Sequence, residues 1–239
     1  MFFNEGKYNT MDSQKIAKFI ELWRDEYAVF RTIDEQICVD KNGEPLPWYT
    51  YPAIEYLQQF DYSRKQIGEF GCGYSCAFWA KRAQNVKAVE NDEKWFERWQ
   101  RELQLDNLEI VLSPQDETYE NSLDKVCDVI VIDGIRRLQC AQKALSLLAD
   151  GGMIIVDDSD RVNNSAEYRQ MIKLLKDADL LQIDFYGCCP MNNFTKATSL
   201  FLRRNFNFPL SVKYQPTNGI GNLWGKSRRE RKEFYKNNK

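Results

Sequence analysis

A short apolar run leads into EFGCGYS (residues 69–75), which continues directly into the helix-like segment SCAFWAKRAQ (75–84). Two glycines two positions apart, Gly71 and Gly73, therefore lie where a strand should turn into a helix. Because glycine has no Cβ atom, the backbone at such a corner can press closely against a ligand. The corner predicts a ligand-binding turn and leaves the kind of ligand open.

From residue 65 onward, strand-like segments alternate with segments that have helical periodicity, among them DEKWFERWQREL (92–103), CAQKALSLLAD (140–150) and AEYRQMIKLLKDAD (166–179). This alternation predicts a Rossmann-like, three-layer αβα fold with a mostly parallel sheet. The last two strands are joined by GCCPMNNFTK (187–196), which is too short for a crossover helix, so they should form an antiparallel hairpin. The seven predicted strands are QIGEF (66–70), VKAVE (86–90), LEIVL (108–112), CDVIVID (127–133), GMIIVDD (152–158), LLQIDFYG (180–187) and ATSLFLRR (197–204).

The 239 residues are enough for one domain with additions at its ends. Residues 12–30 have helical spacing of apolar side chains, and we expect residues 1–60 to form a helical cap over the sheet domain (61–210). The extension (211–239) ends in KSRRERKEFYKNNK, which holds seven Lys or Arg residues and two Glu residues. A solvated terminal helix or a frayed tail is favoured there over a phosphate- or partner-binding arm.

The composition limits both location and chemistry. The chain has no histidine, which excludes a Ser-His-Asp triad and any metal site with histidine ligands. Seven scattered cysteines suit reduced thiols, and neither a secretory signal nor a membrane span is visible, so we predict a cytoplasmic protein without a membrane partner. A net charge of −2 gives no general attraction to nucleic acid, which is not an expected partner.

Glu90 reduces the number of ligand classes that the glycine corner could bind. It ends the second predicted strand nineteen positions after Gly71, where a carboxylate can accept hydrogen bonds from both hydroxyls of a ribose. A dinucleotide and S-adenosylmethionine both carry such a ribose. The dinucleotide fingerprint needs a third glycine, however, and Cys76 stands in that position.

The ordered set EFGCGYS, VEND, CDVIVIDG and DGGMIIVDDSD, followed by the terminal hairpin, resembles the class I S-adenosylmethionine-dependent methyltransferases over about residues 48–204. The resemblance implies that the Glu69–Gly73 turn lies against the methionine moiety of the cofactor and that Glu90 holds its ribose. The cofactor-binding residues that it implies are Tyr49, Thr50, Glu69, Gly71, Cys72, Gly73, Glu90, Asn91 and Asp116. Asn91 or Asp92 would flank the adenine, Asp116 would contact its amino group, and Tyr49 and Thr50 would meet the carboxylate.

Three aspartates should converge at the edge of this pocket, because Asp133 ends the fourth strand while Asp157 and Asp158 end the fifth. Clustered carboxylates repel one another without a cation, and oxygen ligands suit Mg²⁺. The set is similar to that of metal-dependent O-methyltransferases acting on catechols and macrolide sugars, which implies a Mg²⁺ site at these three residues. Arg136 and Arg137 follow immediately, however, so an Asp-Arg clamp on an anionic substrate and simple capping of the next helix stay open.

We therefore predict an S-adenosylmethionine-dependent methyltransferase acting on a hydroxyl of a small molecule, such as a sugar or a natural-product intermediate. Asp133 is the predicted catalytic residue, and Arg136, Tyr186 and Lys196 are predicted substrate contacts, with Asn192 and Asn193 as further candidates in the hairpin loop. An NAD-dependent oxidoreductase and a non-catalytic binding module are the alternatives. Homo-oligomerisation is left open.

Overall fold

The structure is a computed structural model, and it describes residues 13–114 and 116–237. Seven strands form one sheet in the order β3-β2-β1-β4-β5-β7-β6. Strands β1 to β5 are parallel, whereas β7 is antiparallel to both β5 and β6, which confirms the predicted architecture. The bounds are β1 Gln66–Phe70, β2 Asn85–Glu90, β3 Leu108–Leu112, β4 Cys127–Ile132, β5 Leu148–Val156, β6 Leu181–Cys188 and β7 Thr195–Leu202.

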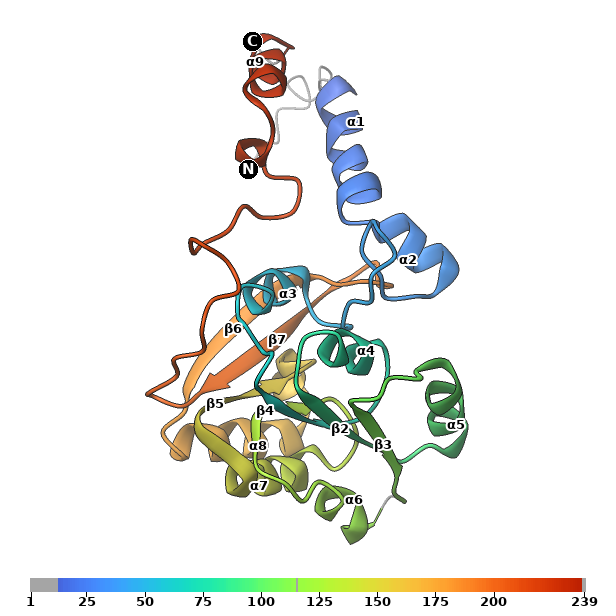
Figure 1. Cartoon of the computed structure of the whole chain (residues 1–239), viewed down its shortest axis with the longest axis vertical. Helices are drawn as coiled ribbons and strands as arrows, with labels where there is room; N and C mark the ends of the chain where they lie inside the picture. Colours follow the sequence, from blue (N-terminus) through green and yellow to red (C-terminus); the bar gives the residue numbers. More distant parts are fainter. Residues whose placement is uncertain (1–12, 115, 238–239) are drawn as a thin grey trace, which may run out of the picture.

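Helices cover both faces of this sheet (Figure 1). Alternate residues of the central strands point to opposite faces, so each face has its own core. Ile67 and Ile155 pack in one core with Trp79, while Ile130 and Ile154 pack in the other. The helices of the sheet domain are α3 Tyr51–Leu57, α4 Tyr74–Ala80, α5 Glu93–Glu102, α6 Glu117–Asn121, α7 Arg137–Leu147 and α8 Ala166–Asp177, with a short 3₁₀ turn at Ser159–Asn163.

The predicted single helix over residues 12–30 is wrong in part, and residue 12 lies outside the described residues. The chain instead forms α1 (Ser13–Glu21), a π-helical turn (Leu22–Glu26) and α2 (Val29–Glu35). The break occurs at Ala28, whose φ of 54° is left-handed and cannot continue a right-handed helix. Apolar spacing alone did not reveal this turn.

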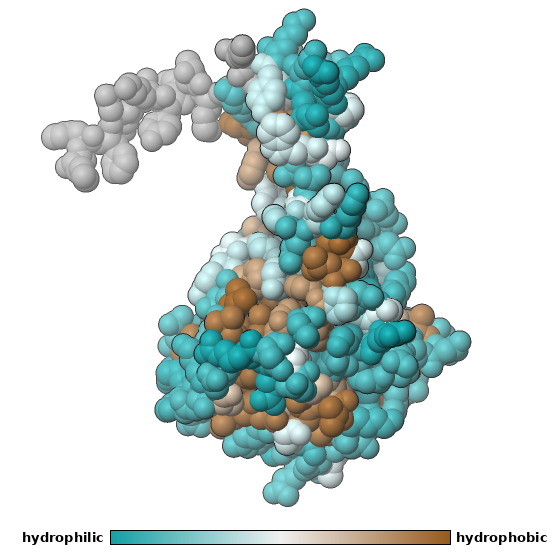
Figure 2. Space-filling view, turned by 60° about the vertical axis from the view of Figure 1, so that its left-hand side comes forward, coloured by the Kyte–Doolittle hydropathy of each residue, from teal (hydrophilic) through white to brown (hydrophobic). Residues whose placement is uncertain are grey.

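The terminal helices stand clear of the globular body. Figure 1 places α1 close to α9 (Arg228–Asn237), and Figure 2 shows this pair above the sheet domain. Among the described residues, we find no helix with the length and apolar character that crossing a membrane requires. The predicted domain boundaries at 60 and 210 stay a prediction.

The strand order reverses between β1 and β4. Strands β1, β2 and β3 succeed one another in one direction from this point, and β4 and β5 follow in the other. In open α/β sheets, ligands bind in the crevice outside the carboxyl ends of the strands at such a switch point. Gly71 follows β1 and Asp133 follows β4, so both lie at the mouth of this crevice.

Candidate active site

The two glycines of the corner meet different needs. Gly71 has a φ of +103°, which residues with a side chain rarely adopt, and a Cβ atom there would lie 3.2 Å from the amide nitrogen of Gly134. Gly71 is therefore required by the backbone itself. Gly73 has extended backbone with φ 169°, and a Cβ atom built on it would meet nothing within 4 Å among the described residues. The open space beside Gly73 is room that a ligand can use.

Glu90 lies directly beside this turn. One oxygen of its carboxylate accepts a hydrogen bond from the Cys72 amide at 3.1 Å. The other accepts from the amides of Asn91 and Asp92 at 2.7 and 2.9 Å. The side chain is buried, yet it borders a cavity, and the oxygen that accepts from Cys72 has a further lone pair for a ligand hydroxyl. Glu90 thus links the end of β2 to the glycine turn.

Two adjoining cavities lie along the turn. The large cavity, of about 570 Å³, is bordered by Gly71, Cys72, Glu90 and Asn91 at one end. The small cavity, of about 310 Å³, extends past Gly73. The residues that border both cavities are Trp48, Cys72, Trp95 and Asp133.

Glu69 borders neither cavity. Its carboxylate accepts hydrogen bonds from the Ser75 hydroxyl at 2.5 Å and the Cys76 thiol at 3.2 Å, which ties the end of β1 to the first turn of α4. Burial raises the pKa of Glu69 to about 8, despite those two hydrogen bonds. The structure thus gives this acid a role in holding the turn rather than a place in the cavity.

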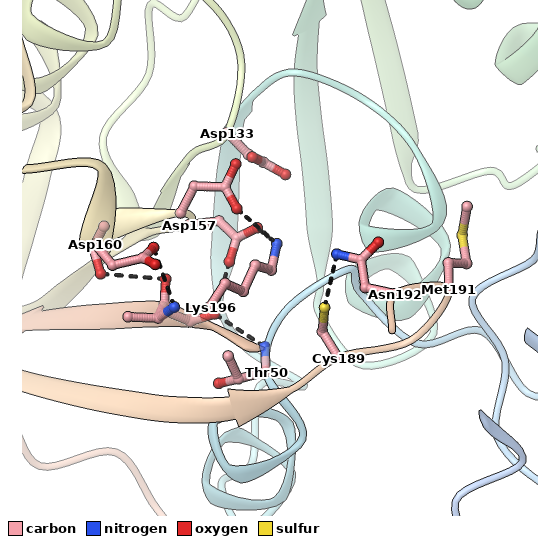
Figure 3. Close-up of polar contacts among 12 residues, drawn as sticks. Thr50, Asp133, Asp157, Asp160, Cys189, Met191, Asn192 and Lys196 are labelled. Atoms are coloured by element: carbon pink, nitrogen blue, oxygen red, sulfur yellow. Dashed lines mark hydrogen bonds and ion pairs between the residues drawn. The ribbon is translucent and has the colours of Figure 1, made fainter. Parts of the chain in front are cut away.

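The opposite end of the large cavity holds the three aspartates together with cations. The ammonium group of Lys196 forms ion pairs with Asp157 and, at 3.0 Å, with Asp158. Asp133 pairs with Arg137 at 3.0 Å. Figure 3 shows the side chains of Asp133, Asp157 and Lys196 gathered beyond the strand ends.

Lys196 reaches this point because β7 is antiparallel. Its first residues therefore lie where the parallel strands β4 and β5 end. Lys196 and Thr198 are two positions apart and share a face, and the Thr198 hydroxyl also donates to Asp157, at 2.7 Å. The backbone amide of Thr50 in turn donates to the Thr198 hydroxyl at 3.0 Å.

Burial and charge act in opposite directions on these groups. Burial raises the pKa of Asp157 to about 7, and Asp133 adds to this rise while Lys196 opposes it. Burial also favours neutral Asp158, but Lys196 and Arg161 outweigh it and hold the pKa of Asp158 below its usual range. Burial disfavours the Lys196 ammonium, yet the three aspartates overcome this and raise its pKa. Lys196 is therefore a firmly charged cation.

Several residues predicted as contacts lie elsewhere. Asp116 is exposed and caps α6 by accepting from the amide of Thr118 at 2.8 Å, and Tyr186 is 69% exposed on the edge strand β6. Arg136 forms a double hydrogen bond with Glu120, at 2.9 and 2.8 Å. None of these three borders either cavity.

Tyr49 and Thr50 are also absent from the cavity walls, because both are completely buried beneath them. Trp48, one residue earlier, borders both cavities instead. The aromatic segment WYTYP (residues 48–52), which includes the predicted Tyr49 and Thr50, therefore reaches the site through Trp48 instead.

One further site residue was missed, and another was named only as an alternative partner of the aspartates. Trp95 borders both cavities and donates from its indole nitrogen to the carbonyl oxygen of Cys72 at 2.6 Å. Arg137 is buried and donates to the carbonyl oxygens of Gly134, Asp133 and Asp157, so it holds together the loops after β4 and β5. Sequence spacing gave no signal for Trp95, since it lies on the outer helix α5, whereas Arg137 was visible as a departure from the expected pattern.

The donor set does not fit the predicted Mg²⁺ site as it stands. The carboxylates of Asp157 and Asp158 are joined by an ammonium group at the point where a metal ion would have to sit. In residues 13–114 and 116–237, no group of three or more acidic or cysteine side chains is arranged to hold a metal ion. Mg²⁺ binding stays a prediction that this geometry does not support.

One segment of the chain is similar to methyltransferases. Residues 69–159 match the family model described as a methyltransferase domain. The cofactor-bound protein Rv0187 from MTB is 18% identical with a TM-score of 0.53, and the match covers 80% of this chain and 97% of that one. A provisionally named O-methyltransferase from Klebsiella pneumoniae is also 18% identical, with a TM-score of 0.55 and coverage of 80% and 98%. At these identities the structural similarity shows the fold, and no curated protein matches the chain in a sequence search.

The matched segment begins at Glu69 and ends at Ser159, so it contains the glycine turn, Glu90 and all three aspartates of the large cavity. The same segment includes the switch point between β1 and β4. The chain therefore contains a segment similar to a methyltransferase domain, set in the same fold as the solved structures that it resembles.

Proposed function

We propose that this enzyme methylates a hydroxyl group on a small molecule, such as a sugar or a natural-product intermediate. One observation carries the proposal: a single cavity is bordered by the Glu90 turn at one end and by charged acid-base groups at the other. Its volume of about 570 Å³ is typical of small-molecule sites, which span ~300–1,000 Å³. The methyl donor and a hydroxyl-bearing acceptor can therefore meet in it.

The cofactor would lie along the glycine turn. The Glu90 oxygen that accepts from Cys72 would also accept from a ribose hydroxyl, and Asn91, which borders the same cavity, would lie on the adenine side. The amino-acid end extends past Gly73 into the small cavity, where the absence of a Cβ atom leaves room. Asp133 borders both cavities and so stands where the methyl group would be presented.

Methyl transfer is an in-line displacement. A lone pair of the acceptor oxygen forms the new O–C bond while the S–C bond breaks, and its electron pair stays on sulfur, giving S-adenosylhomocysteine. The acceptor proton must leave near the transition state. We assign it to the carboxylate of Asp133, whose pKa is raised by burial even though Arg137 opposes this, and which is therefore a stronger base than an exposed aspartate.

The cofactor part of the proposal is tested by calorimetric titration with S-adenosylhomocysteine. We expect Glu90→Ala to weaken binding about 10- to 100-fold, since hydrogen bonds to a charged group are worth about 1.5–3 kcal/mol. Glu93→Ala, an exposed residue in the first turn of α5, is the matched control and should leave affinity unchanged. Equal affinities of wild type and Glu90→Ala would contradict the ribose assignment.

The acceptor class is tested by mass spectrometry. Wild-type enzyme and S-adenosylmethionine are incubated with matched sets of small alcohols, phenols, sugars and amines. We expect methylated products only among the hydroxyl compounds, and Asp133→Asn should abolish them while S-adenosylhomocysteine still binds. Methylation confined to amines would refute O-methylation but leave the methyltransferase activity itself intact.

A further inference from the structure

Lys196 lies in the middle of the acceptor end of the large cavity. Its ammonium group is bonded to Asp157 and to Asp158, and the ring of Trp48 lies 5.6 Å from it on the cavity wall. The side chain is 8% exposed, as is typical of a built site rather than of a surface lysine. An isolated ammonium would not be buried to this degree without charged partners.

The charges of the cluster are already balanced by protein cations. Lys196 forms ion pairs with Asp157 and Asp158, and Arg137 forms one with Asp133. Arg161 forms an ion pair with Asp158 at 2.8 Å. A divalent ion would need the same carboxylate oxygens that now accept from the ammonium. It would also stand within a few ångströms of a fixed positive charge, which low-dielectric surroundings make strongly unfavourable.

We propose that the ammonium group of Lys196 takes the place of a divalent cation at the acceptor end of the cavity, and that the enzyme aligns its acceptor oxygen without a metal. The proposal rests on the proposed function for the identity of the acceptor. The absence of a metal site concerns the protein without substrate, so that part of the proposal does not depend on the proposed function.

The ammonium has the donors that this role requires. Within the described part of the chain, two of its three N–H groups are taken by Asp157 and Asp158, and the third can donate to a hydroxyl oxygen in the cavity. The positive charge then stabilises the negative charge that develops on that oxygen as its proton passes to Asp133. Lys196 keeps its own proton throughout, and the electron pair of the broken S–C bond stays on sulfur.

Removal of the ammonium group should convert the cluster into a metal site. Lys196→Ala leaves Asp157 and Asp158 without the ammonium group that joins them, while Arg137 still pairs with Asp133, and two carboxylates with water are a suitable ligand set for Mn²⁺ or Mg²⁺. We therefore expect Lys196→Ala to bind Mn²⁺ at least tenfold more tightly than wild type does. Electron paramagnetic resonance of Mn²⁺ measures both affinities. Addition of Asp157→Asn to that variant should return the affinity to the wild-type level.

The matched variants separate this role from a merely structural ion pair. Lys196→Arg keeps the positive charge and should bind Mn²⁺ as weakly as wild type, and Lys81→Ala, at an exposed lysine paired with Glu44, controls for loss of a surface charge. A structural ion pair alone would lower stability in Lys196→Ala but would give no gain in metal affinity. S-adenosylhomocysteine binding, measured on each variant, shows that the fold is retained.

Two results would overturn the proposal. One is stoichiometric, micromolar Mn²⁺ binding by wild type, a measurement that does not depend on any variant folding. The other is a folded Lys196→Ala protein that binds Mn²⁺ no better than wild type. Failure of wild type to bind S-adenosylhomocysteine would instead overturn the proposed function, and the two failures can therefore be told apart.

Discussion

Glu69 shows how a residue of a binding motif can serve the fold. Its carboxylate accepts from Ser75 and Cys76, and only 1% of the residue is exposed. Because the folded protein favours the protonated form, with a pKa of about 8 against 4.5 for an exposed glutamate, the native state binds this proton more tightly than the unfolded chain does. The free energy of unfolding should therefore fall as pH rises from about 4.5 to about 8 and then level off.

Glu69→Gln should remove that part of the pH dependence. We expect wild type to lose about 2–3 kcal/mol of stability through this residue between pH 6 and pH 9, since each unit of pKa shift corresponds to about 1.4 kcal/mol. Urea unfolding of both proteins at the two pH values measures the difference. A difference between the proteins that is the same at both pH values would show that Glu69 is already ionised at pH 6. Glu97→Gln, at an exposed position of α5, is the control.

The residues that could be predicted are those whose backbone positions are fixed by strand ends. Gly71, Glu90, Asp133 and Asp157 all lie within one residue of a strand terminus, so sheet topology alone brings them to one edge. Trp48 and Trp95 could not be found in this way. They approach from the cap and from an outer helix, and their places depend on side-chain packing that no short sequence pattern encodes.

At the level of elements, the strands were located within a few residues because continuous apolar runs mark strands buried on both faces. The exception is β5, which begins at Leu148, within a segment that we predicted to be helical. Helix α7 starts at Arg137, earlier than expected, and the Arg137 side chain donates to the carbonyl oxygens of Asp133 and Gly134 in the preceding loop. Contacts of this kind are not visible in the local periodicity of the sequence.

The glycine corner between β1 and α4 allows structure and binding to be separated by mutation. Gly71→Ala should cost about 1–3 kcal/mol of stability, because alanine is strained at a φ of +103° and its Cβ atom would meet Gly134. Gly73→Ala should change stability by less than about 0.5 kcal/mol, since its backbone is extended and the space beside it is open.

Gly73→Ala should weaken cofactor binding even though it has little effect on stability. Calorimetry with S-adenosylhomocysteine should show weaker binding by the stable Gly73→Ala protein, because its new methyl group occupies room that we assign to the cofactor. Thermal denaturation of the two variants measures the change in their stability. Full affinity of Gly73→Ala would show that the cofactor does not pass this position.

On the scale of the whole molecule, the terminal helices α1 and α9 lie away from the sheet domain (Figure 1). The side chain of Arg231 in α9 bonds to the carbonyl oxygens of Trp224 and Lys226, which belong to the same extension. The basic residues of α9 are exposed or only partly buried. The sequence reading left a terminal helix and a frayed tail open for this charge run, and the structure has the helix, whose position near α1 depends on the path of the whole extension.

Removal of residues 227–239 should therefore leave the catalytic domain intact. We expect the midpoint of thermal unfolding to change by less than about 2 °C and the affinity for S-adenosylhomocysteine to stay the same, because little apolar surface is lost. Scanning calorimetry and titration of the shortened chain measure both. A fall of more than about 5 °C would show that the basic helix supports the sheet domain.

The position of β7 has a consequence for the order in which the site is assembled during synthesis. The three aspartates and β6 emerge from the ribosome before Lys196, yet β6 joins the sheet only through β7, which lies between it and β5. A nascent chain that stops short of residue 195 would hold the glycine corner, a detached β6 and three carboxylates without their central cation. Insertion of one late strand supplies the missing charge and completes the sheet in the same event, so the large cavity obtains its full set of charged groups only when the sheet is complete.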